Sequence, residues 1–366
     1  MPAAQSRHID TPNLRFHLLE AGSPTPGREP VLLLHGFPQT SHMWRHQIPA
    51  LHDDGWHVLA PDTRGYGGTE KPRERVTRDV LARDIVDLLD ALGFERAHVV
   101  GHDWGGVIAA ALALKYPERV ARLALIDTLV SVWITWGIHG YWFKCEPDAE
   151  HFFEKHHRDF IRSVFAGEPS PYGGPPESPW AATPDAGASK AFDAFDPTRF
   201  WTPDDVDHYE QAFADPGAWW HAIEYYRHAL PFHIQREDSD AAGGVRHEFL
   251  SNPKVAAMWR HPELIFQHPD WAENFMVYAP EDWQRRFENP TLYLFSPFLV
   301  PQAFEGLDPE ALPPDDYLPT GNLYADSFTH HFPDLRTRGA RCGHFIPEEA
   351  PEHTNAVLRD FLNGRI

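Results

Sequence analysis

Short apolar runs in the first 130 residues, separated by segments with helical periodicity, are the feature that most constrains the fold. The runs are LRFHLLEAG (14–22), VLLLHG (31–36), WHVLAPD (56–62), AHVVGH (97–102) and VARLALID (120–127). The segments between them predict helices at about 41–52, 77–92 and 107–117. Such alternation is typical of a mostly parallel sheet that helices cover on both faces. The sequence therefore predicts an α/β fold.

The alternation stops near residue 131 and returns near residue 289. Between these points the chain is helical, aromatic and acidic, and GEPSPYGGPPESPW at 167–180 has the composition of a long surface loop. A strand pattern returns at TLYLF (291–295), followed by LRTRGARCGHF (335–345) and a final helix at 350–362. We therefore predict a core made of residues 1–130 and 289–366, interrupted by a helical cap at 131–288.

The hexapeptide GHDWGG at 101–106 directly follows an apolar strand. Its spacing is that of a nucleophile elbow, Gly-x-Ser-x-Gly, with Asp103 in place of the serine. A strand that turns sharply into a helix presents the turn residue above the sheet edge, and flanking glycines relieve the crowding. The backbone N–H of Trp104, at the start of the helix, can then form half of an oxyanion hole.

The loop after the strand VLLLHG is expected to supply the other half. In HGFPQ (35–39) the backbone N–H of Phe37 can point toward the elbow while Pro38 turns the chain away. His-Gly-Phe-Pro alone is a weak signal, but an elbow that follows at the expected distance along the chain makes it a strong one.

CGHFIPEEAPE (342–352) lies between the last strand and the last helix, which makes His344 the best candidate for a general base. A histidine base needs a carboxylate to fix its tautomer, and Asp127 at the end of LALID is the first choice. The segment after TLYLF offers Ser296 and no acid before Glu305, so Glu305 and Asp308 are the remaining alternatives.

The stretches LLLHGFPQTSHMW, PDTRGYGGTEKP, VVGHDWGG and CGHFIPEEAPE resemble the α/β-hydrolase superfamily. The closest resemblance is to the subgroup with an aspartate nucleophile, which contains epoxide hydrolases, haloalkane dehalogenases and haloacetate dehalogenases. It covers most of 14–145 and 289–364, and it implies an α/β-hydrolase fold with an inserted cap. It also implies that Asp103 attacks a saturated carbon and forms an alkyl ester, which water activated by His344 then opens.

The branches of this subgroup differ in how they assist the leaving group. Haloalkane dehalogenases resemble the chain in the Asp-Trp pair, but they carry a second donor, such as Asn, where this chain has Phe37. Haloacetate dehalogenases bind the substrate carboxylate with two arginines, whose positions here hold Trp104 and Val107. Epoxide hydrolases share HGFP with GHDWGG. The resemblance therefore favours an epoxide hydrolase acting on an apolar substrate, with a hydrolytic dehalogenase as the alternative.

Epoxide hydrolases protonate the opening ring with tyrosines of the cap. WWHAIEYYRHAL (219–230) resembles one of these regions, with Tyr226 the best match and Tyr225 next. The second region is HGYWFKCEP (139–147), where Tyr141 is available and where an alignment on Phe143 places His139 in the tyrosine position. The residues expected to line the substrate pocket are His35, Trp104, His139, Trp142 and Tyr225.

Composition argues against other classes of function. The net charge of −21, from 53 acidic and 32 basic residues, repels nucleic-acid phosphates and anionic lipids. No stretch reaches the roughly 18 apolar residues that a membrane span requires, and the first residues lack the apolar centre of a signal peptide. With Cys145 and Cys342 as its only cysteines, the chain is expected in the cytoplasm.

The remaining signals point to no cofactor. No histidine pair is accompanied by a zinc-ligand pattern, so we expect no metal, and Cys342 is expected to be a buried core thiol. Arg64 in RGYGG is expected to support neighbouring loops. The cap is longer than such enzymes need, which suits either an extended lid or a contact in a homo-oligomer. A ligand receptor or carrier on the same scaffold is the non-enzymatic alternative.

Overall fold

The computed structural model describes residues 4–133, 143, 147–168, 199–229, 276–277, 279–321 and 323–366. The chain divides into two compact units. The sheet unit consists of Met1–Glu74, Arg78–Val130 and Glu281–Ile366, and the inserted unit consists of Arg75–Thr77 and Ser131–Pro280.

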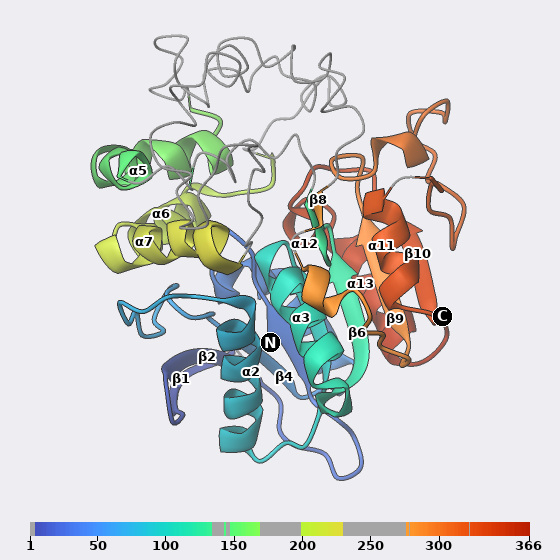
Figure 1. Ribbon diagram of the computed structural model, residues 1–366, viewed down its shortest axis with the longest axis horizontal. Helices are drawn as coiled ribbons and strands as arrows, with labels where there is room; N and C mark the ends of the chain where they lie inside the picture. Colours follow the sequence, from blue (N-terminus) through green and yellow to red (C-terminus); the bar gives the residue numbers. More distant parts are fainter. Residues whose placement is uncertain are drawn as a thin grey trace. The chain divides into compact units, whose positions relative to one another are not determined.

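An eight-stranded sheet forms the centre of the sheet unit, with the strand order β1-β2-β4-β3-β5-β6-β9-β10 (Figure 1). Strand β1 runs antiparallel to β2, β2 runs antiparallel to β4, and the other neighbours are parallel. The strands are β1 (Gln5–Asp10), β2 (Arg15–Ala21), β3 (Val31–Leu34), β4 (Val58–Pro61), β5 (Ala97–His102), β6 (Val120–Ile126), β9 (Thr291–Phe295) and β10 (Leu335–Gly339). Every residue of β3, β4, β5 and β9 is buried, as expected for strands covered on both faces.

Helices join the parallel strands. In the sheet unit they are α1 (Gln47–Asp53), α2 (Arg78–Leu92), α3 (Trp104–Lys115), α11 (Leu323–His331), α12 (Ile346–Glu349) and α13 (Pro351–Leu362). Single turns lie at η1 (Ser41–His46), η2 (Pro117–Arg119), η7 (Pro280–Asp282) and η8 (Pro301–Ala303). The connection from β3 to β4 runs one way across the sheet, whereas those through α2 and α3 run the other way. Right-handed crossovers therefore place α1 on one face and α2 and α3 on the other.

The inserted unit is helical in its described part. It contains α5 (Asp148–Phe165), α6 (Pro203–Phe213), α7 (Pro216–Glu224) and a π-helical turn η5 (Tyr225–Ala229). Thr202 and Asp205 form a capping box at the start of α6, and the side chain of Asp215 caps α7. Strands β7 (Val132–Trp133) and β8 (Met276–Val277) pair antiparallel, so the chain leaves and re-enters this unit along adjacent strands.

The observed sheet confirms the predicted fold class, with differences at some boundaries. Strand β1 was not predicted, because most of its side chains are exposed and polar and leave no apolar pattern. Helix α3 begins at Trp104, at the elbow and before the apolar segment at 107–117, and β10 ends at Gly339, within the segment 335–345. The helix expected at 41–52 is divided between η1 and α1. Among the described residues, we find no helix whose length and apolar character would allow it to cross a bilayer.

Candidate active site

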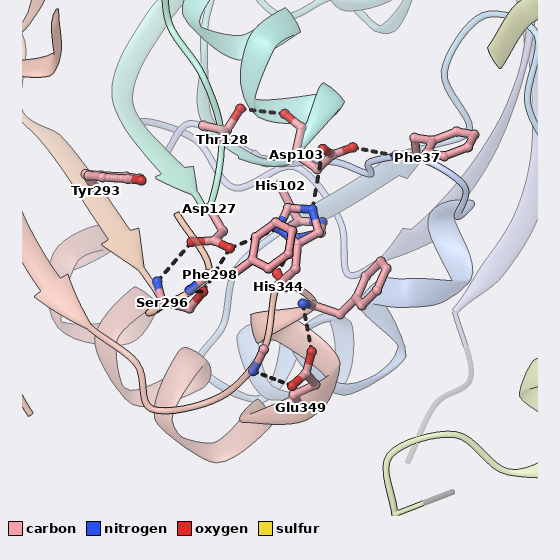
Figure 2. A network of polar contacts seen from close by, with 12 residues as sticks. Phe37, His102, Asp103, Asp127, Thr128, Tyr293, Ser296, Phe298, His344 and Glu349 are labelled. Carbon is pink, nitrogen blue, oxygen red and sulfur yellow. Dashed lines mark hydrogen bonds and ion pairs between the residues drawn. The ribbon is translucent and has the colours of Figure 1, made fainter. Parts of the chain in front are cut away.

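The elbow between β5 and α3 holds Asp103 in an unusual backbone conformation (Figure 2). Its φ is 50° and its ψ is −119°, which a non-glycine residue adopts only under strain of about 1–3 kcal/mol. The strain is held in place by close packing: a Cβ at Gly105 would lie 2.0 Å from the carbonyl oxygen of Leu34. The close contact between β3 and the start of α3 therefore explains why the elbow requires a glycine at this position.

The two carboxylate oxygens of Asp103 lie in different environments. The backbone N–H of Phe37 donates to Oδ1 at 2.7 Å, whereas Oδ2 lies 3.4 Å from Nε2 of His344. Burial alone would raise the pKa of Asp103, but the hydrogen bond and charge of His344 outweigh it and hold the pKa below its usual value. Because its pKa is lowered, this carboxylate is ionised. Because its side chain is 22% exposed, it is also accessible.

The loop at residues 35–39, the candidate oxyanion loop, lies close to Asp103. A Cβ at Gly36 would lie 2.5 Å from Cβ of Asp103, so this position excludes any larger residue. His35, expected in the substrate pocket, is only 1% exposed. Its Nδ1 lies 3.0 Å from the carbonyl oxygen of Gly36, and its Nε2 accepts the N–H of Thr63 at 2.9 Å. Its observed contacts therefore serve the shape of the loop. Trp104, also expected in the pocket, opens α3 and is 3% exposed.

His344 lies between the two aspartates. Its Nδ1 is 2.9 Å from Oδ2 of Asp127, and its Nε2 faces Asp103. Burial would lower the pKa of His344, but the hydrogen bonds and charges of both aspartates outweigh it and raise the pKa to about 10. The ring of Phe298 lies 4.8 Å from the imidazole, centroid to centroid. The structure thus brings together the three side chains that the sequence predicted from separate segments.

Asp127 is fully buried and holds its carboxylate between two partners. Besides His344, it accepts the N–H of Ser296 at Oδ1 and the hydroxyl of Ser296 at Oδ2, both at 2.9 Å. Burial raises the pKa of Asp127, and the bonds to His344 and Ser296 oppose that rise. Glu305 and Asp308 are exposed, so the acid that contacts His344 is Asp127. Ser296, noted in the sequence only because it is not an acid, is part of the arrangement.

Thr128 supports the elbow from below and was not predicted. Its hydroxyl donates to the carbonyl oxygen of Asp103 at 2.5 Å, and its own carbonyl oxygen accepts the hydroxyl of Tyr324 at 2.7 Å. The hydroxyls of Tyr324 and Tyr293 lie 2.5 Å apart, which extends the chain of hydrogen bonds into β9. The side chains of Thr128, Tyr324 and Tyr293 are buried, so this series of hydrogen bonds holds the backbone of Asp103 through α11 and β9.

His102 and Glu349 bond the backbone around His344, the candidate base, and were also not predicted. Nε2 of His102 donates to the carbonyl oxygen of His344 at 2.8 Å, and Glu349 accepts the N–H groups of Gly343 and Phe345 (Figure 2). Burial and the charge of His344 lower the pKa of His102 to about 3, so its ring is neutral. The only sequence signal for either residue is that it lies within the motifs that carry Asp103 and His344.

Comparison with known proteins identifies the architecture. A family model described as the α/β-hydrolase fold matches residues 29–186. Epoxide hydrolase CorEH aligns over 99% of both chains with a TM-score of 0.64 and 20% identity. Epoxide hydrolase A from Mycobacterium thermoresistibile aligns over 99% of this chain and 98% of its own, with a TM-score of 0.64 and 24% identity. The chain has the α/β-hydrolase fold.

Two relatives that match part of the sequence are named epoxide hydrolases. Epoxide hydrolase A of Mycobacterium tuberculosis is 48% identical over 129 residues, which is 35% of this chain and 39% of the relative. Human epoxide hydrolase 4 is 43% identical over 121 residues, which is 32% of this chain and 33% of the relative. The aligned part thus spans less than two fifths of either relative.

The inserted unit contains the remaining predicted site residues. Tyr225 and Tyr226 lie in the π-helical turn and are buried. The ring of Tyr226 packs edge-on against the ring of Phe143, with the centroids 4.8 Å apart. Arg227 anchors the turn by bonding Glu150 and the carbonyl oxygen of Phe143. Tyr141, His139 and Trp142 lie outside the described residues.

Two further sequence interpretations concern groups near the site. Cys342 is buried, and burial raises the pKa of its thiol well above the usual value, so it remains a protonated core thiol. Arg64 forms a two-bond ion pair with Asp84 of α2 at 2.6 and 2.7 Å, which ties the RGYGG loop to that helix. In the parts of the chain that the structure describes, no three histidine, cysteine or acidic side chains cluster as metal ligands would.

Proposed function

We propose that this chain is an epoxide hydrolase that opens apolar epoxides through a covalent ester on Asp103. The observation that carries the proposal is the separation of the two Asp103 oxygens. Oδ1 is held by the Phe37 amide, while Oδ2 faces Nε2 of His344, whose Nδ1 contacts Asp127. An ionised carboxylate is a competent nucleophile toward a saturated carbon, and this one needs no base to activate it.

In the first step Oδ2 of Asp103 attacks a ring carbon of the epoxide. The Oδ2–C bond forms as a ring C–O bond breaks, and the ring oxygen takes a proton from a tyrosine hydroxyl. We assign this acid to Tyr226, with Tyr141 as the second donor. The π-helical geometry of the turn that holds Tyr226 supports the assignment, because such turns recur at functional sites.

In the second step water attacks Cγ of the Asp103 ester. His344 Nε2 takes the proton of this water, negative charge develops on Oδ1, and the N–H groups of Phe37 and Trp104 stabilise it. Esterification removes the charge of Asp103, which is one cause of the raised pKa of His344. The imidazole therefore becomes more readily neutral, and so able to act as a base, after the ester has formed. The Cγ–Oδ2 bond then breaks, Oδ2 leaves as the new oxygen of the diol and takes the proton from His344 Nε2, and Asp127 stabilises the imidazolium until that transfer.

The names of the relatives support an epoxide as the substrate class. An apolar substrate suits the aromatic composition of residues 131–288, which we assign to a cap over the site. The dehalogenase alternative shares the Asp103 ester and differs in the leaving group. The low cysteine content of the protein favours a location in the cytoplasm.

The proposal is tested by trapping the ester. His344→Gln is incubated with a panel of epoxides and haloalkanes, and the peptide that contains Asp103 is analysed by mass spectrometry. We expect an adduct of epoxide mass on Asp103 that persists in the variant and disappears in the native protein. Adducts from haloalkanes alone would indicate a dehalogenase. Turnover by the native protein of a substrate that never labels the variant would exclude a covalent role for Asp103.

A further inference from the structure

Glu349 holds the backbone on both sides of His344. It ends the short helix α12, and its carboxylate turns back toward the preceding loop. Oε2 accepts the N–H of Gly343 at 2.5 Å, and Oε1 accepts the N–H of Phe345 at 2.9 Å (Figure 2). Only His344 lies between these two residues. One side chain therefore bonds the backbone of the residue before and of the residue after the candidate base.

His102 holds the same loop at a third point. Its Nε2–H donates to the carbonyl oxygen of His344 at 2.8 Å, and the two rings lie 4.8 Å apart, centroid to centroid. Together the two residues bond three backbone groups within residues 343–345, namely the N–H of Gly343, the carbonyl of His344 and the N–H of Phe345. The imidazole of His344 can then rotate only about its own side-chain bonds.

Glu349 is an expensive residue to bury without a cation. It is 9% exposed, and among the described residues no arginine or lysine forms an ion pair with it. Glu348, its neighbour in sequence, instead bonds Arg45 and Gln39. A carboxylate offers acceptors to two separate N–H groups at once, whereas a glutamine would direct its NH₂ group at one of them. The chemistry of the position therefore selects an acid.

We propose that Glu349 is a positioning residue for His344, and that its two backbone hydrogen bonds set the distances from the imidazole to Asp103 and Asp127. This rests on the proposed function, in which His344 acts only when the Asp103 ester is hydrolysed. Formation of the ester uses Oδ2 of Asp103 and does not require proton transfer to His344. Loosening the loop should therefore slow the second half-reaction and leave the first nearly unchanged.

The charge of Glu349 gives a second signature. Burial raises the pKa of Glu349 to about 7, against the effect of the two backbone N–H groups, and the charge of His344 also favours its ionised form. By reciprocity an ionised Glu349 favours the protonated form of His344. Removing this anion should lower the pKa of His344. Ester hydrolysis would then reach half of its maximal rate at a lower pH.

The test compares Glu349→Gln with Glu352→Gln, whose side chain is exposed on α13. Ester formation and ester hydrolysis are measured separately in single turnovers of an epoxide such as styrene oxide, from pH 5 to 10. For Glu349→Gln we expect hydrolysis to slow by about 10- to 100-fold, as for other residues that orient a functional histidine, with ester formation within about twofold of native. The half-maximal pH for hydrolysis should fall. The Glu352→Gln control should match the native protein in all three quantities.

Several results would overturn the positioning role. Native hydrolysis with an unshifted pH profile in Glu349→Gln would exclude it, and an equal loss in both half-reactions would indicate a general structural role. If Glu349→Gln does not fold, Glu349→Asp keeps the charge but cannot span both N–H groups, and unaltered hydrolysis in that variant would exclude the role. Absence of any ester in the native protein and in Glu352→Gln would instead refute the proposed function, so the two failures are distinguishable.

Discussion

Nε2 of His102 lies 2.8 Å from the carbonyl oxygen of His344, so the residue before the candidate nucleophile holds the backbone of the candidate base. His102 and His344 are brought together because β5 ends, and the loop after β10 begins, at the carboxyl edge of the sheet. The same edge carries Asp127 at the end of β6 and Ser296 at the end of β9. The sheet and this contact therefore help to bring Asp103 and His344 together.

The origin of the product oxygen tests the ester directly. In a single turnover in H₂¹⁸O with excess enzyme, the diol should contain no solvent oxygen, because its new oxygen comes from Oδ2 of Asp103. The Asp103 peptide should gain one ¹⁸O, detected by mass spectrometry. A labelled diol together with an unlabelled peptide would mean that water attacks the epoxide itself.

The raised pKa of His344 predicts how stability depends on pH. The stabilisation from protonated His344 is fully present below its unfolded pKa of about 6.5 and is lost as pH rises through about 10. Asp103→Asn removes one of the two partners that raise this pKa, so the variant should lose less stability than the native protein between these pH values. Urea unfolding midpoints measure the difference. Asp90→Asn, at an exposed acid paired with Arg119, should follow the native profile.

Asp127→Asn tests which acid orients the base. We expect ester hydrolysis to slow by about 10⁴-fold, as when the orienting aspartate of a catalytic triad is replaced, while the ester still forms and accumulates. Glu305→Gln and Asp308→Asn, at exposed acids of the alternative segment, should retain native rates. Rapid-quench analysis of the Asp103 ester distinguishes these outcomes. A large loss of hydrolysis in Glu305→Gln would contradict the assignment.

Thr128→Val should weaken the elbow. The valine keeps the shape that packs against Gly106 but leaves the carbonyl oxygen of Asp103 without the Thr128 donor. The hydrogen bond from Tyr324 to the backbone carbonyl of residue 128 is kept. We expect a loss of about 1–3 kcal/mol in the free energy of unfolding and slower ester formation. Thr128→Ser keeps the hydroxyl and should retain the rate more fully. Equal rates in the two variants would show that the hydroxyl does not position the nucleophile.

Tyr226→Phe separates the two leaving-group chemistries. Loss of a general acid should slow epoxide opening by about 10²–10⁴-fold, whereas displacement of a halide, which needs no proton, should change little. Ester formation from matched epoxide and haloalkane substrates gives the comparison. Tyr209→Phe, at a buried tyrosine of α6, controls for the loss of a hydroxyl in the inserted unit. Equal effects on both substrates would exclude Tyr226 as the acid.

The sequence predicted those parts of the site that depend on local chain geometry. The elbow, the oxyanion loop and the base loop each lie within a few residues, and a sharp turn leaves its requirement for glycine in the sequence. Asp127 followed from the absence of an acid near Ser296, although the sequence did not indicate that Ser296 binds it. Thr128 and Glu349 could not be predicted, because their roles depend on backbone groups that only the folded chain brings near them.

The pairing of β7 with β8 has a consequence for the history of such proteins. Since the two ends of the inserted unit meet in a short antiparallel ladder, the whole segment branches from the sheet unit at one place. Evolution can lengthen, shorten or exchange that branch without moving a strand of the sheet. Under the proposed function, the reaction and the choice of substrate can therefore diversify separately, and a protein engineer could exchange the inserted segment at the same junction.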